Sequence, residues 1–379
     1  MVKKPIITSI ISLCLFIFAS AADARVFRFG QAEVMFRGSV FETYDDNITY
    51  VKDNKISDYI TKPSVGGRLT YDGKTTTASI DGNYYHEFYA DNSGFNNNSG
   101  ELTAEVNSEL SKYDRFTFRD KYTKTYEPRS FEDQFGFIGG RYSSDRNRID
   151  VGYARDVSQH FGFSARYSNE YNSYSRDDIA KSFLNSGGVE GAYIISSDFS
   201  LFTAYDYTRR DFDDGPHATV NTWSGGFRKY LTKQLYVDAS TGVDFIGAYG
   251  GGTDYTKPFG LISLTDDIDD RTVLNFLFSK RYSTISYSQD IFDQWQVSGT
   301  LNRELTPKLA GTISAFYGKG KYIGTGEEDD FLGSSAGLEY EINDKWKARA
   351  AYSYSKQDSN SIFSEYRKNT VTLGIMAEF

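Results

Sequence analysis

The residues best suited to acid–base chemistry at neutral pH are three histidines, His86, His160 and His217. They lie far apart in the chain, and a lipid hydrolase would need a serine and a histidine within hydrogen-bond distance on one face. His86 shares the outward parity of Ile80 and Tyr84, but the sequence shows no partner for it. We therefore expect no catalytic residue and place His86 at a membrane interface.

Metal and cofactor chemistry has equally little support in the sequence. The acidic clusters at 211–214 and 327–330 lack the spacing of a calcium loop, with its central glycine and distal glutamate. No glycine-rich loop that would cradle a phosphate is present. We expect no metal and no cofactor, and we interpret the two clusters as solvated loop charge.

The first 24 residues have the features of a cleaved signal peptide. Lys3 and Lys4 precede a short apolar run from Ile6 to Phe18, and the small-residue site at 22–24 predicts a cut before Arg25. The one cysteine, Cys14, lies within this run, so the mature chain 25–379 would contain neither disulfides nor thiolate metal sites. The protein is predicted to be exported.

Composition narrows the class of the exported chain. Aromatic residues make up 16% of the sequence, which argues against disorder, and no stretch after Arg25 is apolar for long enough to form a membrane-spanning helix. The mature chain would carry 40 basic and 50 acidic side chains, a formal charge of −10. Such a chain would repel phosphates, so we expect no nucleic-acid partner.

A hydrophobic period of two recurs throughout the mature chain. Phe161, Phe163 and Tyr167 alternate with Gly162, Ser164 and Arg166, and similar alternation fills 292–305 and 366–379. Because successive side chains of a strand point to opposite faces, each segment has one apolar and one polar face.

The connections between these segments alternate between two kinds. Tight turns such as Asp72-Gly73 and Asn343-Asp344 alternate with longer acidic loops such as 45–56 and 172–183. Short turns at one end and long loops at the other are typical of a transmembrane barrel built from hairpins. A large soluble sandwich is the alternative.

We predict an all-β fold, a transmembrane antiparallel up-and-down barrel of about 18 strands, with 16 to 20 possible. The region 127–157 is the least certain, and we interpret 128–140 as a surface loop or a constriction folded into the lumen. The predicted strands are 33–44, 57–71, 75–90, 99–111, 115–126, 141–157, 160–171, 184–196, 199–209, 219–231, 234–246, 256–265, 271–282, 292–305, 308–320, 331–341, 345–356 and 366–379.

The last strand ends the chain on an aromatic residue, with apolar residues at every second position. This resembles the C-terminal signal that outer-membrane barrels present to the barrel assembly machinery. The residues that carry the resemblance are Val371, Leu373, Ile375, Ala377 and Phe379.

The N-terminal part resembles the beta-barrel porin type 2 family, whose members often accompany exopolysaccharide secretion systems. The resemblance is carried by the segments 41–48, 57–60 and 63–66, with Tyr84-Tyr85 in the next hairpin; the strand pair 153–158 and 161–163 also fits. It implies an outer-membrane porin-like barrel that serves as a polysaccharide exit, and it gives no catalytic residues.

An 18-stranded barrel leaves an aqueous channel that side chains alone do not fill. The polar parity of each strand gives candidate lumen-lining residues of both signs, and this balance predicts weak charge selectivity. Hydroxyl, amide and tyrosine groups on the same face could form a track for sugars. The charged candidates are Arg37, Arg68, Asp81, Glu105, Arg119, Lys121, Arg166, Arg228, Asp238, Arg281, Glu304, Glu339, Lys347 and Arg349.

Three functions remain open from the sequence. The first is a channel in the outer membrane of a Gram-negative bacterium that exports an exopolysaccharide. The second is a general or nutrient (saccharide) diffusion porin, and the third is an outer-membrane lipid hydrolase. The expected partners are outer-membrane lipid and lipopolysaccharide, the barrel assembly machinery, periplasmic polysaccharide-export proteins, and a polysaccharide or saccharide cargo.

Overall fold

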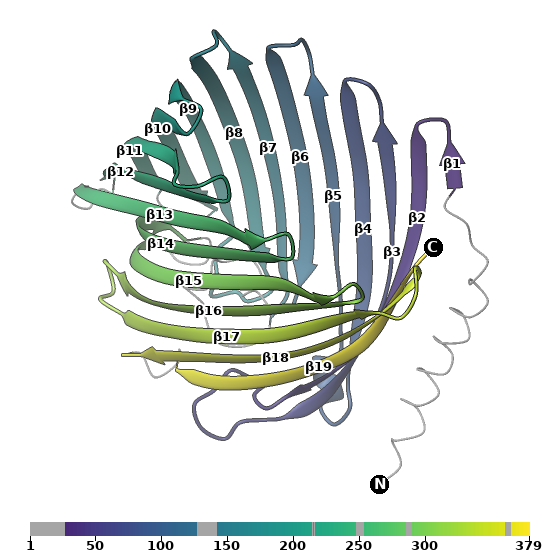
Figure 1. Ribbon diagram of the computed structural model, residues 1–379. Helices are drawn as coiled ribbons and strands as arrows, with labels where there is room; N and C mark the ends of the chain where they lie inside the picture. The colour runs from purple at the N-terminus through teal and green to yellow at the C-terminus, as the bar shows by residue number, and fades with distance from the viewer. Residues whose placement is uncertain are drawn as a thin grey trace.

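The computed structural model describes residues 27–126, 142–213, 215, 217–247, 254–285, 290–360 and 365–379 (Figure 1). The predicted signal peptide 1–24 and the uncertain segment 128–140 lie outside these residues. No helix in the described ranges is long and apolar enough to cross a membrane.

The described chain folds into strands, with one short 3-10 helix at Ser93–Phe95. The strands are β1 (Phe27–Phe29), β2 (Ala32–Asp45), β3 (Asp58–Asp72), β4 (Thr76–Tyr89), β5 (Asn97–Glu109), β6 (Asp114–Thr125), β7 (Ser144–Asp156), β8 (Phe161–Tyr174), β9 (Ser182–Ser196), β10 (Phe199–Phe212), β11 (Ala218–Tyr230), β12 (Leu235–Gly247), β13 (Tyr255–Asp269), β14 (Thr272–Thr284), β15 (Ile291–Thr306), β16 (Leu309–Tyr322), β17 (Glu328–Glu341), β18 (Trp346–Ser359) and β19 (Tyr366–Glu378).

Each strand from β2 to β18 pairs antiparallel with the next, and β19 pairs with β2 from Thr370↔Asp45 to Glu378↔Arg37. The sheet therefore closes on itself, which confirms the predicted 18-stranded barrel and excludes the sandwich. Closure leaves no free edge, so the backbone groups of the strands pair within the sheet. The predicted strand boundaries differ from the observed ones by at most four residues, at the end of β13.

The short strand β1 was not predicted. It pairs with β2 through Phe27↔Val34 and Phe29↔Ala32, just beyond the point where β19 ends. Phe36 of β2 exchanges two backbone hydrogen bonds with Phe379, of 2.9 and 2.8 Å. β1 and the end of β19 thus occupy successive stretches of the same edge of β2, and together they seal the seam of the barrel.

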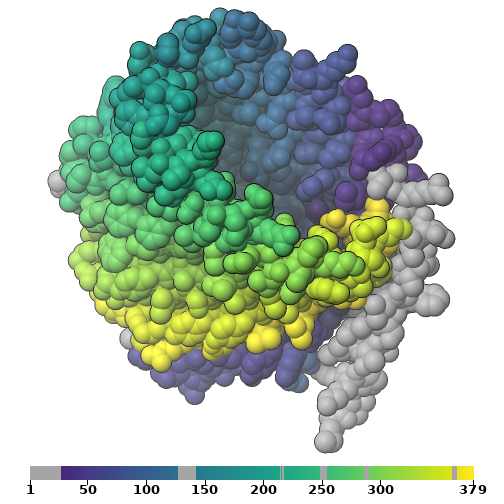
Figure 2. Space-filling model, in the orientation of Figure 1, coloured from purple at the N-terminus to yellow at the C-terminus, as the bar shows by residue number. Residues whose placement is uncertain are grey.

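The two faces of the wall follow the predicted alternation. On β8 the side chains of Phe161, Phe163 and Tyr167 are exposed on the outside, and aromatic rings also pair across outward positions, as Trp295 and Tyr317 do at 5.6 Å. Polar and charged side chains occupy the opposite parity. The space-filling view shows a hollow enclosed by the strands (Figure 2).

Tight turns and long loops lie at opposite ends of the barrel. At the turn between β17 and β18, the Asn343 side-chain oxygen accepts backbone N–H bonds from Lys345 and Trp346, of 2.9 and 3.0 Å. Such a turn closes a hairpin with few residues. We call this the turn end, which also holds the C-terminus, and the opposite end the loop end; in an outer-membrane barrel they face the periplasm and the exterior.

Pro258 accounts for an interruption between β13 and β14. The backbone N–H of Asp267 donates to the Gln234 carbonyl, so the backbone N–H and C=O groups of odd-numbered β13 residues point toward β12. Those of even-numbered residues therefore point toward β14. Pro258 has no N–H to give to β14, and the β13–β14 pairing stops at Gly260↔Lys280. The β14–β15 pairing continues to Thr284↔Ile291.

Freed from β13, the last residues of β14 lean into the barrel. Tyr282 has outward parity, yet it packs in a buried cluster with Ala218, Val220 and Ile246 from the inner face of β11 and β12. The guanidinium of Arg210 on β10 donates to the Thr284 hydroxyl at 3.2 Å. The loop end of the lumen is therefore narrowed on this side by a strand end as well as by side chains.

Candidate functional site

The candidate site is the inner wall of the barrel. The strand register places all the charged residues predicted to line the lumen on the face opposite the exposed apolar side chains. They are distributed over β2 to β6, β8, β11, β12, β14, β15, β17 and β18.

One group of these residues forms a three-residue ion cluster on β2, β3 and β4. Asp81 accepts hydrogen bonds from Arg37, at 2.9 Å for one of them, and from Arg68 at 2.6 Å. The cluster is partly exposed to the lumen, so the pairs stabilise the fold only modestly. Its net charge is positive, since one carboxylate faces two guanidiniums.

A second and more buried cluster surrounds Glu170 on β8. Its carboxylate lies within ion-pair distance of Arg146, of Arg148 at 3.4 Å and of Arg210 at 3.6 Å. Glu170 and Arg210 are 4% and 5% exposed. Because Arg210 also bonds to Thr284, this cluster holds the inward-leaning end of β14. The charged candidates predicted from the sequence do not include Arg146, Arg148 or Arg210.

Most of the remaining charged candidates form ion pairs with the next strand or, for Arg166 on β8 and Asp206 on β10, with the next strand but one. Arg119 contacts Glu105 at 3.1 Å, and Lys121 contacts Glu101 at 3.3 Å. The other pairs are Arg166 with Asp206 at 2.6 Å, Arg228 with Asp238 at 2.6 Å, and Lys347 with Glu339 at 3.2 Å. We call the inner face of β2 to β12, where most of these pairs lie, the charged arc.

The inner face of β15 to β19 is uncharged along its middle stretch, between Glu304 and Glu339 nearer the turn end and Lys368 nearer the loop end. Five hydroxyl side chains face one another across consecutive strand pairs, with Ser314–Ser335 at 2.7 Å and Ser353–Thr370 at 2.6 Å. We call them the hydroxyl row: Thr300, Ser314, Ser335, Ser353 and Thr370. The row borders a pocket of about 500 Å³ that also contacts Tyr50, Lys62 and Phe316.

Inner-face phenylalanines lie against glycines on the adjacent strand. Phe316 is paired with Gly333, and Phe41 with Gly374. A Cβ at either glycine would collide with the facing ring. The missing side chain lets each ring lie along the wall, where it covers the glycine backbone and presents one face to the lumen.

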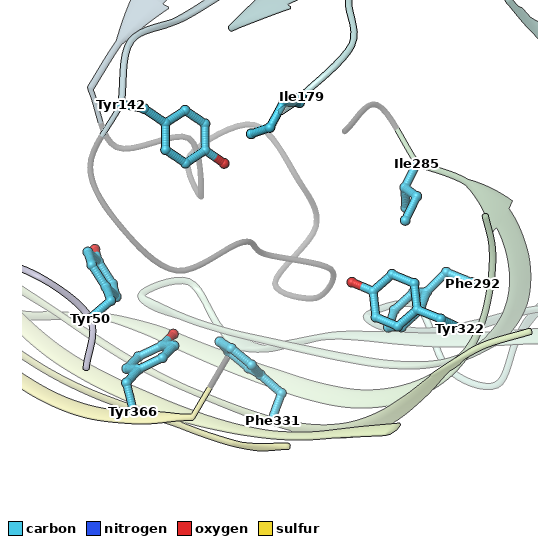
Figure 3. Close-up of a cluster of buried hydrophobic side chains, with 8 residues drawn as sticks. All are labelled: Tyr50, Tyr142, Ile179, Ile285, Phe292, Tyr322, Phe331 and Tyr366. Atoms are coloured by element: carbon cyan, nitrogen blue, oxygen red, sulfur yellow. The ribbon is translucent and has the colours of Figure 1, made fainter. Parts of the chain in front are cut away.

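A cluster of buried aromatic and aliphatic side chains surrounds the lumen at the loop end. It comprises Tyr50, Tyr142, Ile179, Ile285, Phe292, Tyr322, Phe331 and Tyr366. Figure 3 shows Tyr142 and Ile179 on one side of a common region and Phe331 and Tyr366 on the other. We call this set the mouth cluster because it lies at the loop end of the lumen, where its members come from opposite sides of the barrel.

The loop end is also held by ion pairs. The Lys52 ammonium lies 2.7 Å from the Glu365 carboxylate, which joins the first and last long loops and raises the pKa of Lys52 through their hydrogen bond. In the acidic cluster 327–330, Glu328 and Asp330 pair with Lys321 and Lys319 across the hairpin. These acidic side chains are therefore neutralised by neighbouring lysines.

The histidines show no catalytic arrangement in the described part of the chain. The ring of His86, on the outer face of β4, contacts the Asn98 side chain, and His160 contacts the Ile194 carbonyl at 3.1 Å. No group of three or more metal-ligating side chains occurs within the described ranges.

Comparison with known proteins agrees with the barrel. A family described as Putative beta-barrel porin 2 matches residues 288–379, which confirms the predicted resemblance. The match falls on β15 to β19, whereas the motifs that suggested the family lie in the first half of the chain. No curated protein sequence matches the chain.

Among solved structures, the FrpB iron transporter from Neisseria meningitidis (F5-1 variant) superposes with a TM-score of 0.51 at 7% identity, over 91% of this chain and 82% of that one. Acinetobacter baumannii OccAB3 gives a TM-score of 0.49 at 12% identity, over 93% and 100% of the two chains. Pseudomonas aeruginosa OccK2 gives 0.49 at 10% identity, over 92% and 97%. At such low identity the FrpB superposition shows the fold alone.

The closed barrel, its apolar exterior and its polar interior, together with a porin family that matches the last five strands, support one coarse conclusion. The chain is a porin-like β-barrel of the outer-membrane type.

Proposed function

We propose that this barrel is a passive channel for polar solutes and that its particular cargo is an exported exopolysaccharide. The observation that carries the proposal is the contrast between the two arcs of the inner wall. The charged arc is crowded with ion pairs, whereas the middle stretch of β15 to β19 presents hydroxyls and flat aromatic rings.

The uncharged wall suits a chain of sugars. Sugar hydroxyls both donate and accept hydrogen bonds, and serine and threonine hydroxyls can do the same at any point along a sliding chain. Phe316 offers an apolar face beside the hydroxyl row. Because passage depends on bore and wall chemistry, no hydrolytic or transfer step is needed.

A nutrient diffusion porin is the second candidate, and the match to a porin family favours it. The two candidates differ in direction and in cargo size. A lipid hydrolase has no comparable support, because His86 bonds to an amide side chain rather than to a serine.

The test is deletion of the gene in the native bacterium, followed by measurement of polysaccharide at the cell surface and in the periplasm. Export predicts loss of surface polymer and its accumulation in the periplasm. Unchanged surface polymer together with slower uptake of small sugars would favour the nutrient porin instead.

The partners follow from the same proposal. We propose that the signal peptide is cleaved before Arg25, and that the barrel assembly machinery reads the last strand. In that strand Val371 and Leu373 are exposed on the outer face, and Phe379 is hydrogen-bonded to β2. Lipid and lipopolysaccharide would contact the exposed aromatic residues of the exterior.

A further inference from the structure

Between the hydroxyl row and the loop end, the inner wall carries three amide side chains and one carboxylate in two adjacent cross-strand rows. Gln296, Phe331 and Gln357 belong to one row, because Gln296 and Phe331 both pair with Gly318 and Phe331 pairs with Gln357. Gln294 and Asp329 belong to the next row toward the loop end, since both pair with Gly320. We call Gln294, Gln296, Asp329 and Gln357 the amide patch.

The amide patch contains buried polar atoms that bond to nothing in the part of the chain that the structure describes. These atoms are the side-chain oxygens of Gln294 and Gln296, one oxygen of Asp329, and both the oxygen and the nitrogen of Gln357. Gln357 is only 1% exposed. Buried polar groups in folded proteins are nearly always hydrogen-bonded, so several orphaned groups on one stretch of wall indicate a missing partner.

Aromatic rings flank the patch. Phe331, between Gly318 and Gln357, stacks on Phe316 with centroids 5.2 Å apart and ring planes within 14°. Tyr366, which pairs with Gln357, lies 6.4 Å from Phe331 in an edge-on arrangement. Gln357 therefore lies between Phe331 and Tyr366 in its row, and both of these residues belong to the mouth cluster.

These groups determine what class of ligand would fit. An amide offers both donors and acceptors, and an aromatic face suits the apolar face of a pyranose ring. Within the described strands, the two rows contain one cation, Arg281 of β14, which pairs with Gln294 and lies 5.7 Å from the centre of the Phe259 ring. Lys368, in the next row, is paired with Asp45 at 2.8 Å. Arg281 and Asp329 carry opposite charges, so the two rows give an anionic ligand no net electrostatic attraction, and a neutral ligand fits them best.

We propose that the amide patch, with Phe331 and Tyr366, is a binding subsite for a neutral saccharide just inside the loop end of the lumen. The proposal rests on the channel function above and gives it a specific point of contact. In transport, the subsite would hold a sugar unit as it passes the narrow end of the barrel.

The experiment uses the full-length protein refolded in detergent, with neutral maltohexaose as the probe and an anionic uronic-acid oligomer for comparison. Isothermal titration measures binding whether or not the barrel conducts, and blocking of single-channel current measures access from the lumen. The variants are Gln357→Leu and Gln296→Leu, both on the patch. Asn302→Leu is the matched control, because Asn302 is an inner-face amide of β15 that is already bonded to Thr312 at 2.8 Å.

We expect maltohexaose to bind and to block the current, and the uronic-acid oligomer to bind more weakly. Loss of one amide should weaken maltohexaose binding about tenfold, as expected for one well-made hydrogen-bonding group, and the control should change it less than about twofold. Two patch variants are used so that a folding failure of one leaves the other decisive; heat-modified gel migration identifies the folded barrel.

Absence of maltohexaose binding to the wild type, or equal binding by all variants, would overturn the subsite. If the wild type conducts in those circumstances, the channel function still stands. If the wild type binds maltohexaose at the patch but never conducts, the channel function fails while the subsite survives as a binding site.

Discussion

Replacing Glu170 with glutamine should destabilise the barrel more than neutralising any of the partly exposed inner-wall carboxylates described above. Glu170 is the carboxylate that Arg210 contacts within the described residues, and both side chains are almost fully buried. Among the described residues Arg210 would then have no carboxylate partner, although it would keep the hydroxyls of Ser182 at 3.0 Å and Thr284 at 3.2 Å. Removing one partner of a buried ion pair costs about 3–5 kcal/mol. Arg148 keeps Asp150 at 2.8 Å, so we expect the lower limit, about 3 kcal/mol.

The assay is urea unfolding and refolding of the protein in detergent micelles, followed by tryptophan fluorescence. The matched control is Glu190→Gln, since Glu190 lies 3.9 Å from Arg166, which keeps a closer bond to Asp206. That control should cost less than about 1 kcal/mol, as partly exposed pairs do. If the Glu170 variant lost no more stability than the Glu190 variant, the Glu170 cluster would not be holding the wall together.

Three further predictions concern the wall. Gly333→Val should push the Phe316 ring into the lumen and lower single-channel conductance. The control Gly337→Ala, whose Cβ would meet its nearest atom at 3.8 Å, should leave conductance unchanged. Equal effects of the two substitutions would contradict the packing of Phe316 against Gly333. Asp81→Asn should leave Arg37 and Arg68 without their shared carboxylate. The permeability ratio should then shift toward anions about twofold, which is the effect of one charge about 8 Å from an ion in water. Reversal-potential measurements that showed no shift would refute the position of this cluster in the lumen. Pro258→Thr should supply the missing backbone N–H opposite Tyr282 and slow amide hydrogen exchange at 282–284 at least about fivefold. The control Lys257→Thr should leave this exchange unchanged, because the backbone N–H of residue 257 faces β12.

The strands and their faces could be predicted because both depend on local alternation. Phe161 to Tyr167 show the outward and inward parity of β8 without reference to any neighbouring strand. The turns at Asp72-Gly73 and Asn343-Asp344 give the hairpin ends in the same way. The even number of strands then favours a closed barrel, because single-chain bacterial barrels have even strand numbers.

What could not be predicted depends on register between strands. The pairing of Phe316 with Gly333, and the convergence of Arg146, Arg148 and Arg210 on Glu170, require knowing which residues face each other across two or more strands. The inward lean of β14 had one visible signal: Pro258 stands inside the predicted strand 256–265. Its effect depends on its N–H position facing β14 rather than β12, which only the register reveals.

The amide patch was missed for a related reason. Gln294 and Gln296 lie in the alternating segment 292–305, but nothing in the sequence shows that they share rows with Asp329 and Gln357. Their lack of partners is a property of the folded wall. β1 could not be predicted either, because a strand of three residues is too short to show a pattern of alternation.

Transport through this barrel requires that the chain enclose a water-filled passage between its charged arc and its hydroxyl row. The most direct measurement is the current through a planar lipid bilayer after refolded protein, checked for its heat-modifiable barrel form, is added. We predict long-lived current steps of uniform size that scale with salt concentration and show weak preference between cations and anions. A folded, inserted protein that passed no current at any voltage would contradict the presence of this passage.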